Sequence, residues 1–81
     1  MHISFEALSQ PYSKLYIEIA IGNTLYKTIY LNTSSGLSSY HENVSVPYNQ
    51  IGYTIAFIEP SITYSNGIIS GATFLYNITV T

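Results

Sequence analysis

The most reactive neighbours in the chain are His41 and Glu42, and eleven serines are available as nucleophiles. A Ser–His–acid hydrolase needs an acid that orients the histidine ring. Adjacent residues of a β-strand point to opposite faces of a sheet, so Glu42 cannot readily orient His41 there. The chain also lacks the Gly-x-Ser-x-Gly pattern that exposes a nucleophilic serine at a sharp turn. The pair therefore indicates polar surface positions on a strand, and we expect no catalytic residue and no enzyme.

The N-terminal residues His2, Ser4 and Glu6 alternate along a predicted strand and therefore share one of its faces. Residues four apart on a strand are separated by about 13 Å. A metal ion needs its ligands about 2 Å away, so His2 and Glu6 are too far apart to share one. The sequence has no cysteine and no other cluster of histidine and acidic residues at ligand spacing. We expect no metal site and no cofactor.

Nine tyrosines and three phenylalanines supply the largest apolar groups of the chain. Aromatic faces stack on the apolar faces of sugars, so an exposed row of tyrosines would indicate a glycan-binding platform. Most tyrosines instead alternate with the predicted core positions, which favours core packing with the hydroxyl at the rim, and there is no tryptophan. Tyr16 falls on the outer face, whereas the tyrosines expected in the core are Tyr26, Tyr30, Tyr53, Tyr64 and Tyr76. A glycan partner is therefore the weaker interpretation.

Three Asn-x-Ser/Thr patterns, at Asn32, Asn43 and Asn77, match the acceptor for N-glycosylation. The chain has six asparagines and nineteen serines and threonines, so chance alone would produce some of these patterns. They matter only if the protein is exposed outside a cell that glycosylates. On that condition the three asparagines are candidate modification sites.

The elements that carry these residues are all predicted to be β-strands. Apolar and polar residues alternate with period two along nearly the whole chain, and no stretch has helical periodicity. Asn66-Gly67 is the strongest short signal for a hairpin turn, and Gly71 marks a bulge or bend. The expected strands cover residues 3–8, 14–21, 24–30, 37 or 38 to 46, 51–58, the hairpin 62–70, and 72–80. In the last strand the residues expected to point inward are Phe74, Tyr76, Ile78 and Val80.

The clearest hairpin joins residues 14–21 to 24–30 through Gly22-Asn23, with glycine first as a type II′ turn prefers. Closing the hairpin there places Glu18 directly opposite Lys27. An opposite-charge pair across two strands contributes about 0.2–1 kcal/mol and helps to fix the register. The expected charge pair therefore supports the hairpin.

The same register predicts a candidate interface on the face of this hairpin that lies away from its core face. The residues on that face are Tyr16, Ala20, Leu25 and Ile29. Apolar residues on both faces indicate that both are covered, one by the core and the other by another subunit or domain. The first and last strands carry no charge except Glu6, so they could also pair with a neighbouring chain. The expected partners are copies of this chain or other structural subunits.

The number and spacing of the strands predict the fold class. About seven short strands, separated by roughly 8–12 residues, indicate an all-β domain spanning residues 1–81. The best match is a single antiparallel sandwich of the immunoglobulin-like or transthyretin-like kind, without the cysteines and tryptophan of true immunoglobulin domains.

Charged residues make up only 7% of the chain, and the formal net charge is −2. Two lysines and no arginine exclude a nucleic-acid binder, which needs several cations to neutralise phosphates. No apolar run approaches the roughly 20 residues that span a bilayer, and the N-terminus does not resemble a signal peptide. Acid unfolds proteins mainly by protonating paired carboxylates, and this chain has four carboxylate side chains. The composition predicts an acid-stable protein facing the exterior, or else a mostly buried subunit.

The stretches Asn43-Val44-Ser45-Val46-Pro47 and Gly52-Tyr53-Thr54-Ile55 resemble a recurring pattern in sandwich domains of secreted proteins from acidophilic, thermophilic archaea. In those domains a Val-Pro turn and a Gly-Tyr pair lead into a strand, at a shorter spacing than here. The charge-poor composition, rich in Ile, Tyr, Asn, Ser and Thr, is similar to that of those proteins and of structural proteins of the viruses infecting the same hosts. The resemblance implies an extracellular or virion sandwich domain and implies no catalytic residues.

These features together predict a non-catalytic structural subunit of an extracellular assembly, such as a virion shell, a spike or a surface filament. Sandwich packing and apolar or edge-strand contacts would hold it in place. The alternative is a binding or adhesion module of a larger cell-surface protein that recognises glycan or protein. An enzyme is the least favoured interpretation.

Overall fold

A computed structural model describes residues 1–31, 35–46 and 52–81 of the chain, which form eight β-strands and no helix. The prediction of an all-β fold is confirmed. The predicted strand position at Ile51 lies outside the described residues. The strands are β1 (His2–Ser9), β2 (Tyr16–Ile21), β3 (Thr24–Tyr30), β4 (Gly36–Asn43), β5 (Tyr53–Ile58), β6 (Thr63–Ser65), β7 (Ile68–Ser70) and β8 (Thr73–Val80).

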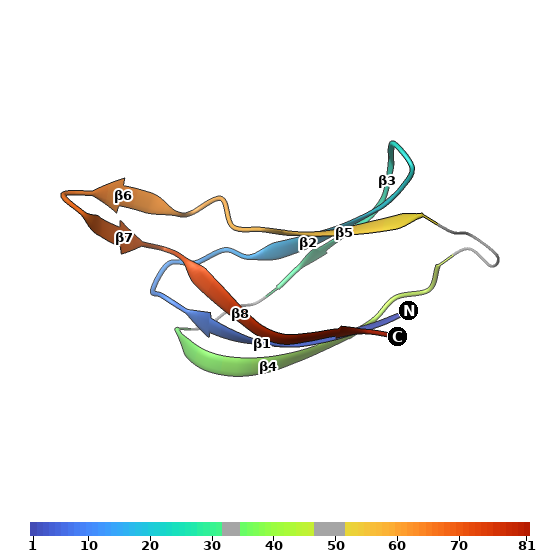
Figure 1. Ribbon diagram of the computed structural model, residues 1–81, viewed down its shortest axis with the longest axis horizontal. Coiled ribbons are helices and arrows are strands. Elements are labelled where there is room, and N and C mark those ends of the chain that lie inside the picture. The colour runs from blue at the N-terminus through green and yellow to red at the C-terminus, as the bar shows by residue number, and fades with distance from the viewer. Residues whose placement is uncertain (32–34, 47–51) are drawn as a thin grey trace.

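Two three-stranded antiparallel sheets form the layers of a small sandwich, one in the order β4-β1-β8 and the other in the order β3-β2-β5 (Figure 1). The hairpin β6-β7 is a separate two-stranded sheet that extends from one end of the sandwich. Strand β1 is central in its sheet, so the prediction that it could pair with a neighbouring chain is wrong. Strand β8 does have a free edge.

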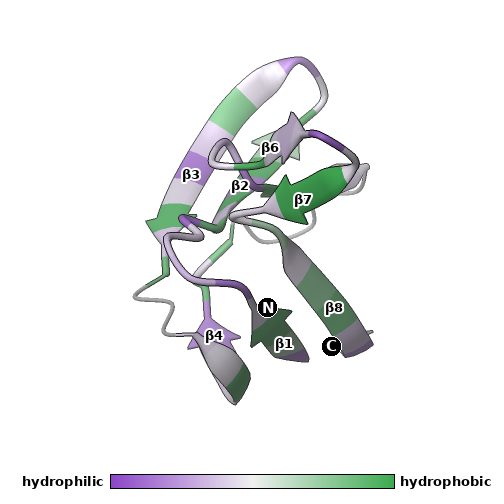
Figure 2. Cartoon of the chain, turned by 90° about the vertical axis from the view of Figure 1, so that its left-hand side faces the viewer, coloured by the Kyte–Doolittle hydropathy of each residue, from purple (hydrophilic) through white to green (hydrophobic). Residues whose placement is uncertain are grey.

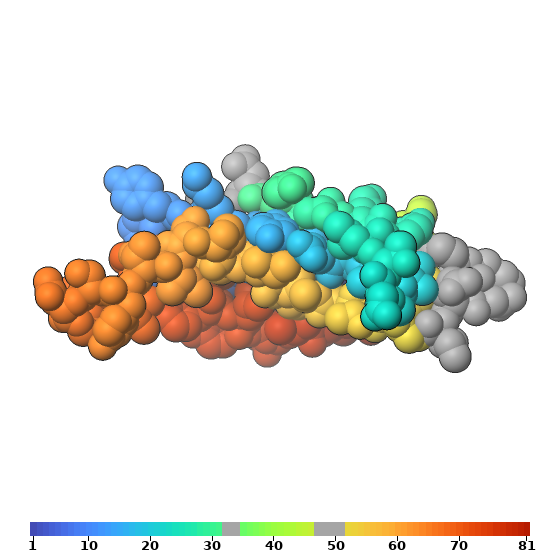
Figure 3. All heavy atoms as spheres, turned by 90° about the horizontal axis from the view of Figure 1, so that it is seen from above, coloured from blue at the N-terminus to red at the C-terminus, as the bar shows by residue number. Residues whose placement is uncertain are grey.

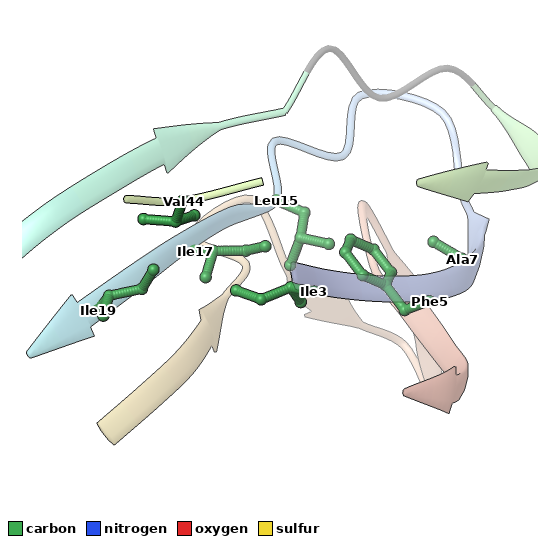
Figure 4. Close-up of a cluster of buried hydrophobic side chains, with 7 residues drawn as sticks. All are labelled: Ile3, Phe5, Ala7, Leu15, Ile17, Ile19 and Val44. Carbon is green, nitrogen blue, oxygen red and sulfur yellow. The ribbon is translucent and has the colours of Figure 1, made fainter. Parts of the chain in front are cut away.

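The core lies between the two central strands. Every second side chain of β1 and β2 points toward the facing sheet. These side chains pack against one another and are buried. Figure 4 shows the cluster, which consists of Ile3, Phe5, Ala7, Leu15, Ile17, Ile19 and Val44. The Phe5 ring stacks on Tyr40 of β4 and meets Phe57 of β5 edge-on, each with a centroid distance of 5.2 Å. One aromatic residue of the central strand thus links both sheets.

The flanking strands are less well covered than the central ones. The chain exposes 5418 Å² of surface, whereas a compact protein of its 9.0 kDa mass would expose about 4,900 Å². Its radius of gyration is 13.9 Å, against about 12 Å for a compact domain of this length. The space-filling view in Figure 3 shows this elongated shape, which measures 47 × 25 × 18 Å. A sandwich only three strands wide therefore leaves much of its apolar surface in water.

The two predicted hairpin turns have the backbone angles that their turn types require. Gly22 has a φ of +59° and Ile21 pairs with Thr24, as expected for a two-residue turn with glycine first. Asn66 and Gly67 both have positive φ, at 53° and 76°, which is the type I′ pattern that joins β6 to β7. The turn predictions at these two hairpins are confirmed.

Candidate interaction surfaces

The outer face of the β4-β1-β8 sheet is polar along one half. His2 and His41 stack there with a ring-centroid distance of 5.7 Å, and His2 Nδ1 lies 2.6 Å from Asn43 Oδ1. Ile3 pairs with Glu42 and Ser4 with His41, so His41 and Glu42 are on opposite faces as predicted. The histidines therefore lie on an open hydrogen-bonding surface, and Glu42 does not orient either ring.

The other half of the same face is apolar. Leu37 exposes 64% of its surface, and Phe74 and Tyr76 expose 47% each. Leu8 of β1 pairs with Leu37 on one side and with Phe74 on the other, so these side chains form one continuous surface across the sheet. We call it the outer patch and define it as Leu8, Leu37, Phe74 and Tyr76. A groove of 310 Å³ opens on it, lined by Glu6, Leu8, Leu37, Tyr76 and Asn77.

A bulge in β8 produces the outer patch. Asn77 has a φ of 53°, and the register of β8 against β1 shifts at this point, where β8 carries one extra residue. An extra residue reverses the alternation on one side of the bulge relative to the other. The prediction that Phe74 and Tyr76 point inward is therefore wrong, and half-buried Leu75 takes the inner position opposite Ala7. Ile78 and Val80 lie beyond the bulge, and each of them is about half exposed.

A second bulge alters the predicted β2–β3 hairpin. The pairs match the prediction as far as Ala20, and the register then shifts so that Ile19 lies opposite Lys27, with Tyr26 as the extra residue of β3. Glu18 lies opposite Thr28 instead, and its side chain is on the opposite face of the sheet from that of Lys27. The predicted charge pair is therefore wrong, although the hairpin itself is present.

The shift also changes the predicted interface on this hairpin. Ile29 lies opposite Ile17 on the inner face and packs against the core, so its assignment to the outer face is wrong. Tyr16, Ala20 and Leu25 remain on the outer face, where Ala20 and Leu25 are directly opposite each other. Their role as an interface stays a prediction.

The tyrosines divide into covered and exposed sets. Tyr53 packs against the core as predicted, and the Tyr26 hydroxyl donates a 3.0 Å hydrogen bond to the Ser45 carbonyl oxygen. Tyr16 is on the outer face, with its ring centroid 5.6 Å from that of Tyr30. Core placement is wrong for the four that are exposed, namely Tyr26, Tyr30, Tyr64 and Tyr76.

The hairpin β6-β7 projects beyond the sandwich, and we call residues 63–70 the arm (Figure 1). Within the described residues, no Cα atom of β6 or β7 comes within 8 Å of a Cα atom of any other strand. Tyr64, paired with Ile69, exposes 72% of its surface, and Ile68 on the opposite face exposes 68%. Figure 2 shows the strongly apolar β7 facing outward at this end. The arm therefore presents large apolar side chains that its own chain does not cover.

The base of the arm is fixed to the sandwich by specific contacts. The Gln10 side-chain amide donates to the Ile69 carbonyl at 3.2 Å, and its oxygen accepts from the Ala72 amide at 2.9 Å. Gly71 is buried with a φ of +72°, and a Cβ atom there would overlap the Ser61 carbonyl oxygen. The prediction of a bend at Gly71 is confirmed, and the reason is close backbone packing.

A cleft of 340 Å³ lies beside this base. Tyr12 on its rim is 89% exposed and has a φ of 68°. Lys14 also lines the cleft, and its backbone amide donates to both Glu59 carboxylate oxygens, at 2.6 and 2.9 Å. The remaining wall is mostly hydroxyl-bearing or small, and consists of Pro11, Ser61, Thr63, Ser70 and Gly71. An aromatic ring beside several hydroxyls is an arrangement that could hold a small polar ligand such as a sugar.

Two of the three candidate glycosylation sites lie among the described residues. Asn43, at the end of β4, and Asn77, at the β8 bulge, are both exposed. Asn77 Nδ2 donates to Glu6 Oε1 at 3.4 Å. Asn32 lies outside the described residues.

No three His, Cys, Asp or Glu residues of the described ranges come close enough together to hold a metal ion. Those ranges also contain no helix with the length and apolarity needed to cross a membrane. Comparison with protein-family models, curated proteins and solved structures found no match to the chain. The exposed surfaces themselves are therefore the features that bear on function.

Proposed function

We propose that this domain is a non-catalytic structural subunit of an extracellular assembly, such as a virion shell, a spike or a surface filament. One observation carries the proposal. Among the described residues, fourteen large hydrophobic side chains are exposed, whereas eight hydrophobic residues form the buried core. A domain that exposes this many large apolar groups gains stability when copies of itself or other subunits cover them.

The size of the gain can be worked for two residues of the outer patch. Phe74 and Tyr76 each expose 47% of their surface, which is about 200 Å² in total for side chains of this size. Removing that area from water contributes about 5 kcal/mol at about 25 cal/mol per Å². This is comparable to the lower estimates for the cost of association, about 4 kcal/mol, so two rings already offset much of that cost.

The free edges support the same proposal. Strand β8 is an edge strand without a charged residue or a proline, and only its bulge at Asn77 interrupts the edge. Natural proteins protect such edges with charges or cover them with other elements. The scarcity of charge and the three Asn-x-Ser/Thr patterns are compatible with a surface that faces the exterior.

Immunogold electron microscopy of the native source tests the proposal. Antibody raised against the purified domain should label the outside of cells or particles at regular spacing. Labelling confined to the cell interior would contradict the extracellular part, and scattered labelling without regular spacing would contradict the structural part.

The cleft beside the arm favours a second candidate, a binding or adhesion module that recognises a glycan. Tyr12 on its rim offers a free ring face, and Ser61, Thr63 and Ser70 offer hydroxyls for hydrogen bonds. A glycan array with wild type and Tyr12→Ser tests this candidate. Binding that the substitution abolishes would favour it over the structural subunit, and no binding by the wild type would remove it.

A further inference from the structure

The arm and the outer patch are two uncovered apolar surfaces at the same end of the molecule. Strand β7 ends at Ser70 and β8 begins at Thr73, so Phe74 of the patch follows the arm almost directly (Figure 1). Within the described residues, the strands of the arm nevertheless have no Cα atom within 8 Å of β1, β4 or β8 of their own chain. A chain cannot cover either surface by itself, but a second copy facing this end can cover both.

The groove on the outer patch matches a side chain that the arm presents. Its walls are apolar, from Leu8, Leu37 and Tyr76, and Glu6 and Asn77 add polar atoms. An aromatic ring with a hydroxyl satisfies both parts, because the ring packs on apolar walls and the hydroxyl bonds to a carboxylate or an amide. Tyr64 is the arm residue of that description.

Charge restricts the kind of partner. Residues 60–81, which include the arm and β8, contain no charged side chain. Lys14 beside the arm's base and Glu6 in the groove are isolated charges, so a nucleic acid, an acidic peptide or a charged membrane surface would find little to pair with on this side. A second copy of the chain brings the same uncharged, apolar surfaces and so complements it.

We infer that two copies exchange arms reciprocally, with Tyr64 and Ile69 of each copy seated in the outer patch of the other. This inference rests on the proposed structural function. Both surfaces lie at one end of the molecule, so reciprocal seating closes a two-fold dimer in which the same contact is made twice.

The area available fits such a dimer. One arm seated on one patch covers about 500 Å² of exposed apolar surface, counting Ile62 at the arm's base. Two such contacts cover about 1,000 Å², and a standard interface of about 1,600 Å² contains roughly 900 Å² of apolar area. A single contact would bury only an area typical of weak, transient complexes. The two-fold arrangement is therefore the one that yields a stable dimer.

The test uses sedimentation equilibrium of the full chain and four variants. Tyr64→Ser removes the inserted ring and Leu37→Ser removes a wall of the groove, and each should weaken the dimer at least tenfold, as expected for a buried anchor. Ile68→Ser, on the opposite face of the arm, and Tyr30→Ser, on the other sheet, are matched controls that should leave it unchanged. Circular dichroism checks that every variant remains folded.

Mixing the two weakened variants gives the decisive result. In a mixed pair, the intact arm of the Leu37→Ser chain can still enter the intact groove of the Tyr64→Ser chain. The mixture should therefore form a heterodimer more readily than either variant alone. A wild type that dimerises while neither substitution weakens it, or no gain on mixing, would overturn the arm exchange and leave the proposed function standing. A wild type that stays monomeric throughout would also overturn the arm exchange, and it would restrict the proposed function to assembly with other subunits.

Discussion

Replacing Gly71 with alanine tests whether the base of the arm is packed as closely as the structure has it. Gly71 has a φ of +72°, a conformation that costs a residue with a Cβ atom about 1–2 kcal/mol. Its added methyl group would also overlap the Ser61 carbonyl oxygen, and such overpacking adds about 1–3 kcal/mol. We expect Gly71→Ala to lower the free energy of unfolding by about 2–5 kcal/mol.

Gly67 is a matched control for this substitution. Its φ of +76° is nearly the same, but no atom lies within 4 Å of where its Cβ would be. Gly67→Ala therefore carries the backbone strain without the overlap and should cost about 1–2 kcal/mol. The difference between the two variants isolates the contact with Ser61.

Urea unfolding followed by far-ultraviolet circular dichroism measures both variants, at concentrations where the chains are monomeric. A domain of 81 residues has a total stability of about 4–12 kcal/mol, so the expected loss for Gly71→Ala is a large fraction of it. Equal losses for the two variants would show that the Ser61 backbone does not approach Gly71, and the fixed base of the arm would then be refuted.

Three further predictions concern the core, one hydrogen bond and acid. Ile29→Lys should destabilise the fold because Ile29 packs against the core. Leu25→Lys, on the outer face, should leave the urea midpoint nearly unchanged, and equal effects of the two substitutions would contradict the β2–β3 register. Tyr26→Phe should cost about 0.5–1.5 kcal/mol in the same assay, because it removes the bond to the Ser45 carbonyl, and no loss would mean that the bond is not formed in solution. The fold should persist to about pH 2–3 because few carboxylates can be protonated, and cooperative loss of the circular dichroism signal near pH 4 would refute this.

Local patterns predicted much of the fold. Alternation identified the strands, and the core faces of β1, β2 and β5 are those that the period-two pattern indicated. The turns at Gly22-Asn23 and Asn66-Gly67 were predictable because a positive φ favours glycine or asparagine. These features depend on residues that are adjacent in the chain, so the sequence alone is enough to predict them.

The interaction surfaces were less predictable because two bulges reverse the alternation. One extra residue at Asn77 moved Phe74 and Tyr76 outward, and one at Tyr26 moved Ile29 inward. Bulges are set by pairing with a distant strand, and their local signal is weak. Asparagine at position 77 was one such signal, since it tolerates a positive φ.

The order of strands within each sheet was also beyond local patterns. Strand β1 lies between β4 and β8, which come from distant parts of the chain, so its edges are covered. Period two shows which residues share a face, but it does not show whether that face is covered. The arm illustrates this, because Tyr64 has the pattern of a core residue and yet exposes 72% of its surface.

Native mass spectrometry of the wild-type chain over a series of concentrations tests the central claim, that the chain's exposed apolar surfaces assemble copies of it. We expect species at multiples of the 9.0 kDa chain mass, with the dimer fraction growing as concentration rises. A single 9.0 kDa species at every concentration would contradict it, because the outer patch and the arm would then remain in water without a partner.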